Sequence, residues 1–369
     1  MSGWTLAALI ASSLAAFLFG YLALFPVPAS PVVWAAPPPP GFTGRFAPNR
    51  RLEHLRMIAL GGQVGPEHVT IARDGRVCAA MTSGAIVCLD PDGQDLKILA
   101  ETGGRVLGIA FDASGRMILA DAMRGLLAID AAGGISVLAE QVAPGDPIRY
   151  ANALDIGPDG TIYFTDSSTR FAPREWGGTY QASVLDIMEQ SATGRVLAYD
   201  PRTGRTVIVA RGFSFSNGIA VSADGQLLFV SETGRYRVWK VASSARNIGI
   251  GNGTDQASVL LDNLPGYPDN LTRGEGGRYW LGLFRPRNPA ADRLAPYPFL
   301  RKVLLRLPRA LLPLGKPYGH VLAFNEHGVI VETLQDPSGA YPETTGATEF
   351  GGRLYIHSLT APSLGWLSL

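Results

Sequence analysis

Short polar side chains that carry oxygen recur in four similar contexts along the chain. The contexts read GPEHV, YANALDI, FSNGIAV and YPDNLTR, and they contain Glu67, Asn152, Asn217 and Asp269, with Asn270 beside the last. Two carboxylates and two or three amide oxygens meeting at one point would form a set of hard oxygen ligands. Such a set suits Ca²⁺ better than zinc or copper, which prefer nitrogen and sulfur. The pattern raises the hypothesis of a calcium site, although any one of these residues alone is more typical of a turn.

Six copies of one phrase run through the chain, each made of an apolar strand, a tight turn and a second strand. The copies are VTIARDGRVCAAM, GIAFDASGRMILAD, ALDIGPDGTIYFTD, GIAVSADGQLLFVSE, NLTRGEGGRYWLGL and ATEFGGRLYIHSL. Their turns contain Gly75, Gly115, Gly160, Gly225, Gly277 and Gly352, as expected where the backbone needs a positive φ. A further strand pair follows several copies, as in GAIVCLDPDG, and four strands make one blade of a β-propeller.

The repeat predicts an all-β fold, a six-bladed β-propeller preceded by an N-terminal transmembrane helix. A β-sandwich of regular hairpins is the alternative, but it does not explain why one phrase returns in every unit. The innermost strands of a propeller line its axis, so residues at equivalent positions in different blades converge on one tunnel. The longer gaps between Gly160 and Gly225, and between Gly277 and Gly352, predict insertions that cover one face.

The composition excludes some classes of partner. The chain of 369 residues is 46% apolar and 17% charged, which allows a large core. Its net charge of +1 provides no field that would attract nucleic acid, so we expect no nucleic-acid binding.

The two cysteines, Cys78 and Cys88, flank a turn at Thr82-Ser83-Gly84, so two paired strands would place them opposite one another. Both a disulfide and a pair of buried thiols are consistent with this spacing.

The N-terminal segment is long and apolar enough to cross a membrane. Residues 4–25 carry no charge, and a helix of about 20 residues rises roughly 30 Å. We expect a retained anchor over residues 1–25, a stiff Pro-rich linker over 26–51 and the propeller over 52–369. A cleaved secretory signal is the alternative. Both interpretations place the propeller outside the cytoplasm, on the periplasmic or extracellular side.

A basic amphipathic insertion is predicted near residues 298–312. The stretch PFLRKVLLRLP places Arg301, Lys302 and Arg306 among leucines, which is the pattern of a short amphipathic helix. Such a helix could lie on a membrane surface or pack as a lid on the propeller, and the sequence leaves both open.

The repeated stretches also carry a family resemblance. YANALDIGPDGTIYFTDSSTRF, TGRVLAYDPRTG, FSNGIAVSADGQLLFVSET, LPGYPDNLTR and YPFLRKVLLRLP together resemble the strictosidine synthase-like proteins. These proteins belong to a wider group of calcium-dependent six-bladed propellers that includes gluconolactonase and paraoxonase, and the layout here is most similar to their membrane-anchored animal members. The resemblance implies that Glu67, Asn152, Asn217 and Asp269 match the calcium ligands, with Asn270 matching an additional ligand of the paraoxonase branch.

Three departures from the family pattern limit what the resemblance implies. Thr345 stands where strictosidine synthase has its catalytic glutamate, which argues against the condensation of an amine with an aldehyde. Leu107 stands where paraoxonases have a histidine, which argues against a histidine-based hydrolytic dyad. His68 and Ala153 replace acidic residues of a second calcium site, so we expect one Ca²⁺ and not two.

The sequence favours a calcium-dependent enzyme that hydrolyses lactones or small carboxylic esters. Asp269 is the candidate nucleophile or general base, and Glu67 is the second candidate catalytic carboxylate. The alternatives are a condensing enzyme of the strictosidine synthase type and a non-catalytic propeller that binds a ligand or partner.

Overall fold

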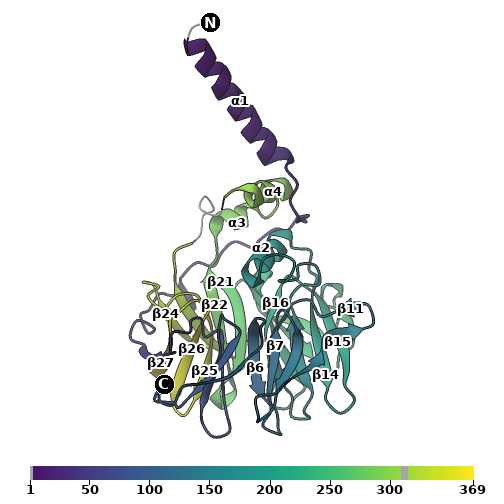
Figure 1. Cartoon of the computed structure of the whole chain (residues 1–369), viewed down its shortest axis with the longest axis vertical. Helices are drawn as coiled ribbons and strands as arrows, with labels where there is room; N and C mark the ends of the chain where they lie inside the picture. The colour runs from purple at the N-terminus through teal and green to yellow at the C-terminus, as the bar shows by residue number, and fades with distance from the viewer. Residues whose placement is uncertain (1–2, 309–314) are drawn as a thin grey trace.

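The computed structural model describes residues 3–308 and 315–369, and within these the repeat forms six blades of antiparallel strands (Figure 1). The predicted insertion over 298–312 therefore lies in part, from residue 309 on, outside the described residues. The first three blades contain β2 (His68–Ile71), β3 (Val77–Ala80), β4 (Ala85–Leu89) and β5 (Lys97–Glu101); β6 (Val106–Phe111), β7 (Met117–Asp121), β8 (Gly125–Ile129) and β9 (Ile135–Ala139); and β12 (Ala151–Ile156), β13 (Ile162–Asp166), β14 (Gly194–Asp200), β15 (Arg205–Phe213) and β19 (Ile248–Gly249). The last three contain β16 (Ser216–Val221), β17 (Leu227–Glu232), β18 (Arg237–Ala242) and β20 (Ala257–Leu261); β21 (Gly266–Arg273), β22 (Arg278–Pro286), β23 (Gly319–Asn325) and β24 (Ile330–Asp336); and β25 (Thr344–Phe350), β26 (Arg353–Ser358), β27 (Ser363–Ser368) and β1 (Arg56–Ala59).

The first-named strand of each blade is its innermost strand. Each innermost strand contacts that of the next blade, from β2 through β6, β12, β16 and β21 to β25, and β25 contacts β2 again. The innermost strands therefore form a closed ring around the axis, and the sequence prediction of a six-bladed propeller is confirmed.

The ring is closed by pairing the two ends of the propeller. Strand β1, at the N-terminal end of the propeller, pairs antiparallel with β27, so that Ile58 lies opposite Leu364. Ile58 is 5% exposed and packs in the same cluster as Leu364 and Trp366. The last blade thus takes its outermost strand from the other end of the sequence, which ties the two ends of the propeller together.

Three short helices lie on one face of the propeller, between its strands and α1 (Gly3–Leu24) (Figure 1). They are α2 (Thr179–Glu189), α3 (Pro289–Leu294) and α4 (Pro298–Arg306), and they fall in the two insertions that the uneven repeat spacing predicts. The remaining elements are β10 (Gln141–Ala143) and β11 (Asp146–Pro147), which form a hairpin, and the 3₁₀ segments η1 (Gly44–Phe46), η2 (Thr233–Arg235), η3 (Ile250–Asn252) and η4 (Glu275–Gly277).

Helix α1 has a mean hydropathy of 2.0 and none of its residues is buried by the propeller. Among the described residues it is the one helix long and apolar enough to cross a membrane, and a signal sequence at this position has the same properties.

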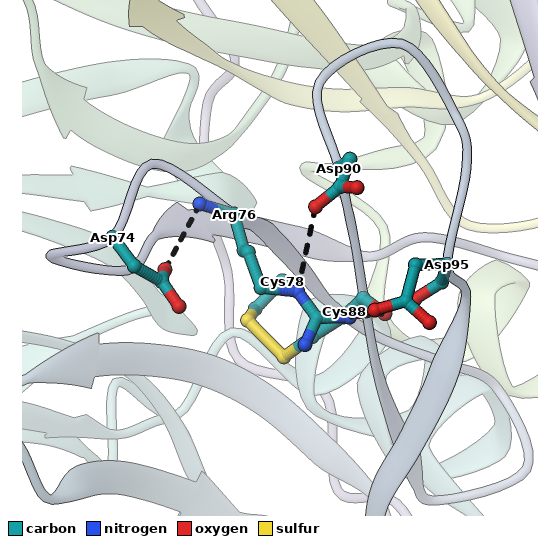
Figure 2. The surroundings of a disulfide bond; sticks show 6 residues. All are labelled: Asp74, Arg76, Cys78, Cys88, Asp90 and Asp95. Atoms are coloured by element: carbon teal, nitrogen blue, oxygen red, sulfur yellow. Dashed lines mark hydrogen bonds and ion pairs between the residues drawn. A yellow bond between two sulfur atoms is a disulfide. The ribbon is translucent and has the colours of Figure 1, made fainter.

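Cys78 and Cys88 form a disulfide with an S–S distance of 2.06 Å (Figure 2). The two residues lie directly opposite each other on β3 and β4, as the turn between them predicts. Arg76 lies beside the bond and donates from its backbone N–H to Asp74, 3.1 Å away, while its side chain reaches Asp90 and Asp95. The sequence leaves open a disulfide or a pair of buried thiols, and the structure contains the disulfide.

We predict that truncation of Ile58 weakens the closure of the ring. Ile58→Ala should lower the free energy of unfolding by about 2–4 kcal/mol, because it removes buried methyl groups from a packed core. Met57→Ala is the matched control, since Met57 is 54% exposed on the same strand. Urea unfolding followed by fluorescence measures both variants, and equal midpoints for the two would contradict the packing described here.

Candidate metal centre in the central tunnel

The predicted oxygen ligands lie at one level of the innermost strands. The sequence places them just before the first strand of a blade, and this holds for Glu67, which immediately precedes β2. Asn152, Asn217 and the pair Asp269–Asn270 instead lie inside β12, β16 and β21. In these three blades the strand therefore begins one to three residues before the predicted ligand, earlier than the sequence predicts.

A β-bulge marks each of these three positions. In β12 the residues Ala151 and Leu154 pair with Asp166 and Phe164, so the innermost strand has one residue more than its partner. The same extra residue occurs in β16 between Ser216 and Ile219 and in β21 between Pro268 and Leu271. A bulge re-aims a side chain that simple alternation would send elsewhere, and it is common beside active sites.

Four of the five predicted residues line a single cavity. Glu67, Asn152, Asn217 and Asp269 all border a cavity of about 360 Å³ on the axis. Asn270 lies beside it, fully buried, and its Nδ2 donates to the backbone oxygen of Glu67 at 3.0 Å and to Glu67 Oε1 at 3.4 Å. The structure thus brings side chains from the first, third, fourth and fifth blades together.

The two carboxyl groups share a desolvated environment. Burial raises the pKa of Glu67 to about 7, although the Arg105 guanidinium and the Asn270 amide lower it. Burial also raises the pKa of Asp269 well above its ordinary value, and the charge of Glu67 raises it further. Both carboxylates are therefore costly to ionise unless a metal ion binds between them.

Two amide oxygens at the site lack a hydrogen-bond partner. Asn217 Oδ1 and Asn270 Oδ1 are buried and accept no hydrogen bond. The Asn152 amide is oriented by donation from its Nδ2 to Ser167 Oγ at 2.9 Å. A buried acceptor without a donor is unfavourable, by about 1–3 kcal/mol. A cation among these residues would satisfy both oxygens and neutralise the carboxylates.

The type of donor decides which metal would fit. Within the described residues no group of three or more His, Cys, Asp and Glu side chains is placed to hold a metal ion. The two carboxylates can therefore act as a metal site only together with the Asn oxygens. An all-oxygen set of this kind fits calcium and not zinc or copper.

Hydroxyl groups from neighbouring blades fix the backbone of the predicted ligands. Thr345 Oγ1 donates to the backbone oxygen of Glu67 at 2.9 Å. Thr165 Oγ1 donates to that of Asn217 at 2.6 Å. Ser231 Oγ donates to that of Asp269 at 2.6 Å. Each bond joins two blades, so the spacing of the blades determines the spacing of the ligands.

Sequence reasoning missed Arg105. This residue is 6% exposed, its Nη2 lies 3.4 Å from Glu67 Oε2, and its Nη1 donates to the backbone oxygen of Met81 at 2.7 Å. A signal was present, since the arginine directly precedes the innermost strand of the second blade. The second blade therefore contributes a cation beside Glu67, and the Arg105 guanidinium stabilises the ionised carboxylate.

Four aromatic residues between Trp176 and Phe215 separate into two groups. Tyr180 and Phe215 line the cavity. Phe213 packs on Trp239 in a core cluster, and Trp176 packs on Phe171.

The residues that depart from the family pattern also lie on the innermost strands or next to them. Leu107 and Thr345 occupy the bulges of β6 and β25, which are equivalent to the positions of Asn152 and Asn217. His357 is fully buried, and its ring lies 5.2 Å from that of His68.

The fold and the tunnel define a six-bladed β-propeller with an oxygen-lined axial cavity. The family model described as Strictosidine synthase matches residues 152–245, and Strictosidine synthase-like, N-terminal matches residues 44–89. Adipocyte plasma membrane-associated protein of Danio rerio is 32% identical, over 93% of this chain and 84% of that protein. Protein STRICTOSIDINE SYNTHASE-LIKE 10 of Arabidopsis thaliana is 30% identical, over 84% of this chain and 87% of that protein. The chain belongs to the strictosidine synthase-like family.

Solved structures share the fold at lower identity. A gluconolactonase from Xanthomonas campestris superposes with a TM-score of 0.61 at 21% identity, covering 93% of this chain and 99% of its own. The calcium-binding protein regucalcin from Agrobacterium tumefaciens superposes with a TM-score of 0.57 at 14% identity, and the match covers 85% of this chain and 93% of regucalcin.

We predict that a methyl group at Gly218 disturbs the site. A Cβ there would lie 2.4 Å from the backbone oxygen of Asp269 and 2.4 Å from the backbone nitrogen of Leu271. Gly218→Ala should therefore force β16 and β21 apart and lower the free energy of unfolding by about 1–3 kcal/mol. Gly251→Ala is the control, because nothing lies within 4 Å of a Cβ at that position. Urea unfolding that gives both variants the same stability would show that the two strands do not need this close approach.

Proposed function

We propose that the chain is a calcium-dependent hydrolase of lactones or small carboxylic esters, held at a membrane by α1. One observation carries the proposal: two buried carboxylates and the unpaired oxygen of Asn217 border a largely apolar cavity, and the unpaired oxygen of Asn270 lies on the residue next to Asp269. The similarity of the fold to that of a gluconolactonase supports the lactone or ester class.

Glu67, Asn152, Asn217 and Asp269 would hold the ion, with Asn270 as an additional oxygen donor. When bound, calcium supplies a Lewis acid that polarises a carbonyl oxygen and stabilises negative charge on it. Glu67 is the less available carboxylate for chemistry, because it already faces Arg105 and accepts from Asn270.

Asp269 is the proposed general base. Its side chain borders the cavity, and unlike Glu67 it forms no ion pair with an arginine among the described residues, so it would be the carboxylate that faces both the ion and the substrate. The carboxylate would remove a proton from a water molecule as the water oxygen bonds to the carbonyl carbon. The C–O bond of the ester or lactone then breaks, and the leaving alkoxide takes up the proton, which yields an acid and an alcohol.

The cavity fits a small, mainly apolar substrate. Phe215 and Phe284 come from the propeller, and Val184, Ile187 and Leu294 come from the helices above it. Such a cavity, of about 360 Å³, excludes water around the reacting carbonyl and has room for a small ester or lactone.

A condensing activity of the strictosidine synthase type is the second candidate, and the family match favours it. Thr345 argues against it, because this side chain is fully buried and its hydroxyl is committed to the backbone of Glu67. No carboxylate occupies that position to act as the base.

The location proposed for the propeller is outside the cytoplasm. The disulfide between Cys78 and Cys88 supports this, because such bonds persist in oxidising compartments. The proposed division into an anchor (1–25), a Pro-rich linker (26–51) and the propeller (52–369) rests on the apolar helix and on the position of β1.

We predict that calcium stabilises the protein through Glu67 and Asp269. Calcium added after chelation should raise the melting temperature, by the equivalent of about 2.7 kcal/mol at a hundredfold excess over Kd. Glu67→Gln and Asp269→Asn should abolish this shift, and Asp269→Asn should also reduce hydrolysis of an aryl ester or lactone panel at least tenfold. Asp255→Asn, at an exposed position, is the control. A wild-type protein inactive on the whole panel at every calcium concentration would favour a non-catalytic, ligand-binding propeller.

We predict that the effect of calcium grows with pH. Without calcium, the raised pKa of Glu67 stabilises the folded protein relative to the unfolded chain at low pH, where the carboxyl is protonated. This stabilisation is lost as the pH rises through about 7, where Glu67 ionises. Calcium binds the ionised groups, so its affinity should fall about tenfold per pH unit below that value for each proton displaced. Melting curves with and without calcium at pH 6 and pH 8 test this. A larger shift at pH 6 than at pH 8 would contradict it.

A further inference from the structure

Helix α4 exposes two large apolar side chains near its N-terminal end and buries its two arginines. Phe299 is 56% exposed and Leu300 is 40% exposed, whereas Arg301 and Arg306 are buried. The sequence predicts an amphipathic helix here but not which way its arginines face. A helix that faced water would expose the arginines and bury the aromatic ring.

The buried Arg306 joins α4 to the end of α1. Its Nη1 donates to the backbone oxygen of Leu22 at 2.7 Å and its Nε to that of Phe25 at 2.5 Å. Tyr21 in turn donates from its hydroxyl to the backbone oxygen of Arg306 at 3.1 Å. The last carbonyls of a helix lack partners within the helix, and a guanidinium satisfies them well. The C-terminal end of α4 therefore lies beside the C-terminal end of α1.

A second set of bonds joins α4 and the Pro-rich segment to α2. Arg301 donates to the backbone oxygens of Met188, at 2.8 Å, and of Val32. Glu189 accepts from the backbone of Ser30 at 2.7 Å through its side chain and from Val32 at 2.9 Å through its backbone oxygen. The anchor, the segment after it and the two helices are thus connected as one block on the face of the propeller (Figure 1).

Together with α3, the same block forms the outer wall of the cavity. Ile187 of α2, Leu294 of α3, and Leu304 and Leu305 of α4 line it, and Asp269 lies at the propeller side. An apolar wall therefore continues from the candidate catalytic carboxylate to the helix that lies beside the anchor.

We propose that α4 lies in the interface of the lipid bilayer, with Phe299 and Leu300 among the acyl chains, and that the substrate is a lipophilic ester or lactone that enters from the bilayer. The occupant of this apolar surface is lipid, because α1 and α4 share hydrogen bonds and the arginines of α4 face inward. The substrate assignment rests on the proposed function, whereas the placement of α4 does not.

The placement is tested without any activity measurement. Phe299→Cys in the full chain is labelled with a polarity-sensitive fluorophore and reconstituted in phosphatidylcholine vesicles. The label should emit at shorter wavelength than in water and be quenched by spin-labelled lipid. Ala113→Cys, in the exposed turn between β6 and β7, is the control and should respond to neither. A label at position 299 that behaves like the one at 113 would overturn the proposal.

The route of entry is tested with two substrates of the same ester chemistry. One is a water-soluble aryl acetate, and the other is a long-chain aryl ester dissolved in the vesicles. The double variant Phe299→Asp, Leu300→Asp should lose at least tenfold of the turnover of the long-chain ester and keep that of the acetate within twofold. Phe350→Asp, which alters an exposed phenylalanine at the end of β25, should change neither.

Equal losses on both substrates, or no loss on either, would refute entry from the bilayer. A wild-type protein that hydrolyses neither ester would refute the proposed function and the substrate assignment together. The fluorophore result would still decide where α4 lies.

Discussion

The cost of burying two carboxylates near one another is the constraint on which the rest of the structure depends. Glu67 and Asp269 come from the first and fifth blades, burial raises the pKa of both, and the charge of Glu67 raises that of Asp269 further. Arg105 offsets part of that cost on the side of Glu67. Charges placed this way are hard to explain as a contribution to stability, because a packed apolar tunnel would be cheaper. They are readily explained as a site for a divalent cation.

The propeller brings these groups together by a few local devices. A bulge turns a side chain of an innermost strand towards the axis, and a hydroxyl from the neighbouring blade holds the backbone at that level. Gly218 lets two innermost strands approach more closely than any side chain would allow. Because these devices recur from blade to blade, the geometry of the site depends on the closure of the whole ring, including β1 paired with β27.

The sequence predicts the features that repeat and misses those that depend on packing between distant segments. The turn glycines and the register of Asn152 and Asn217 follow from local chemistry that recurs in each blade. The bulges could not be foreseen, since one extra residue leaves no mark in the hydrophobic pattern. Arg105 meets Glu67 only across two blades, and the inward orientation of Arg306 depends on carbonyls of α1 far away in sequence.

The central claim is that oxygens from four blades share one cation. The most direct measurement is anomalous diffraction from crystals of the protein in which Tb³⁺ replaces Ca²⁺. The account predicts one anomalous peak on the propeller axis, within about 2.3–2.6 Å of carboxylate oxygens of both Glu67 and Asp269 and of the unpaired oxygen of Asn217. A tunnel without a peak, or a peak bound only at the molecular surface, would contradict it.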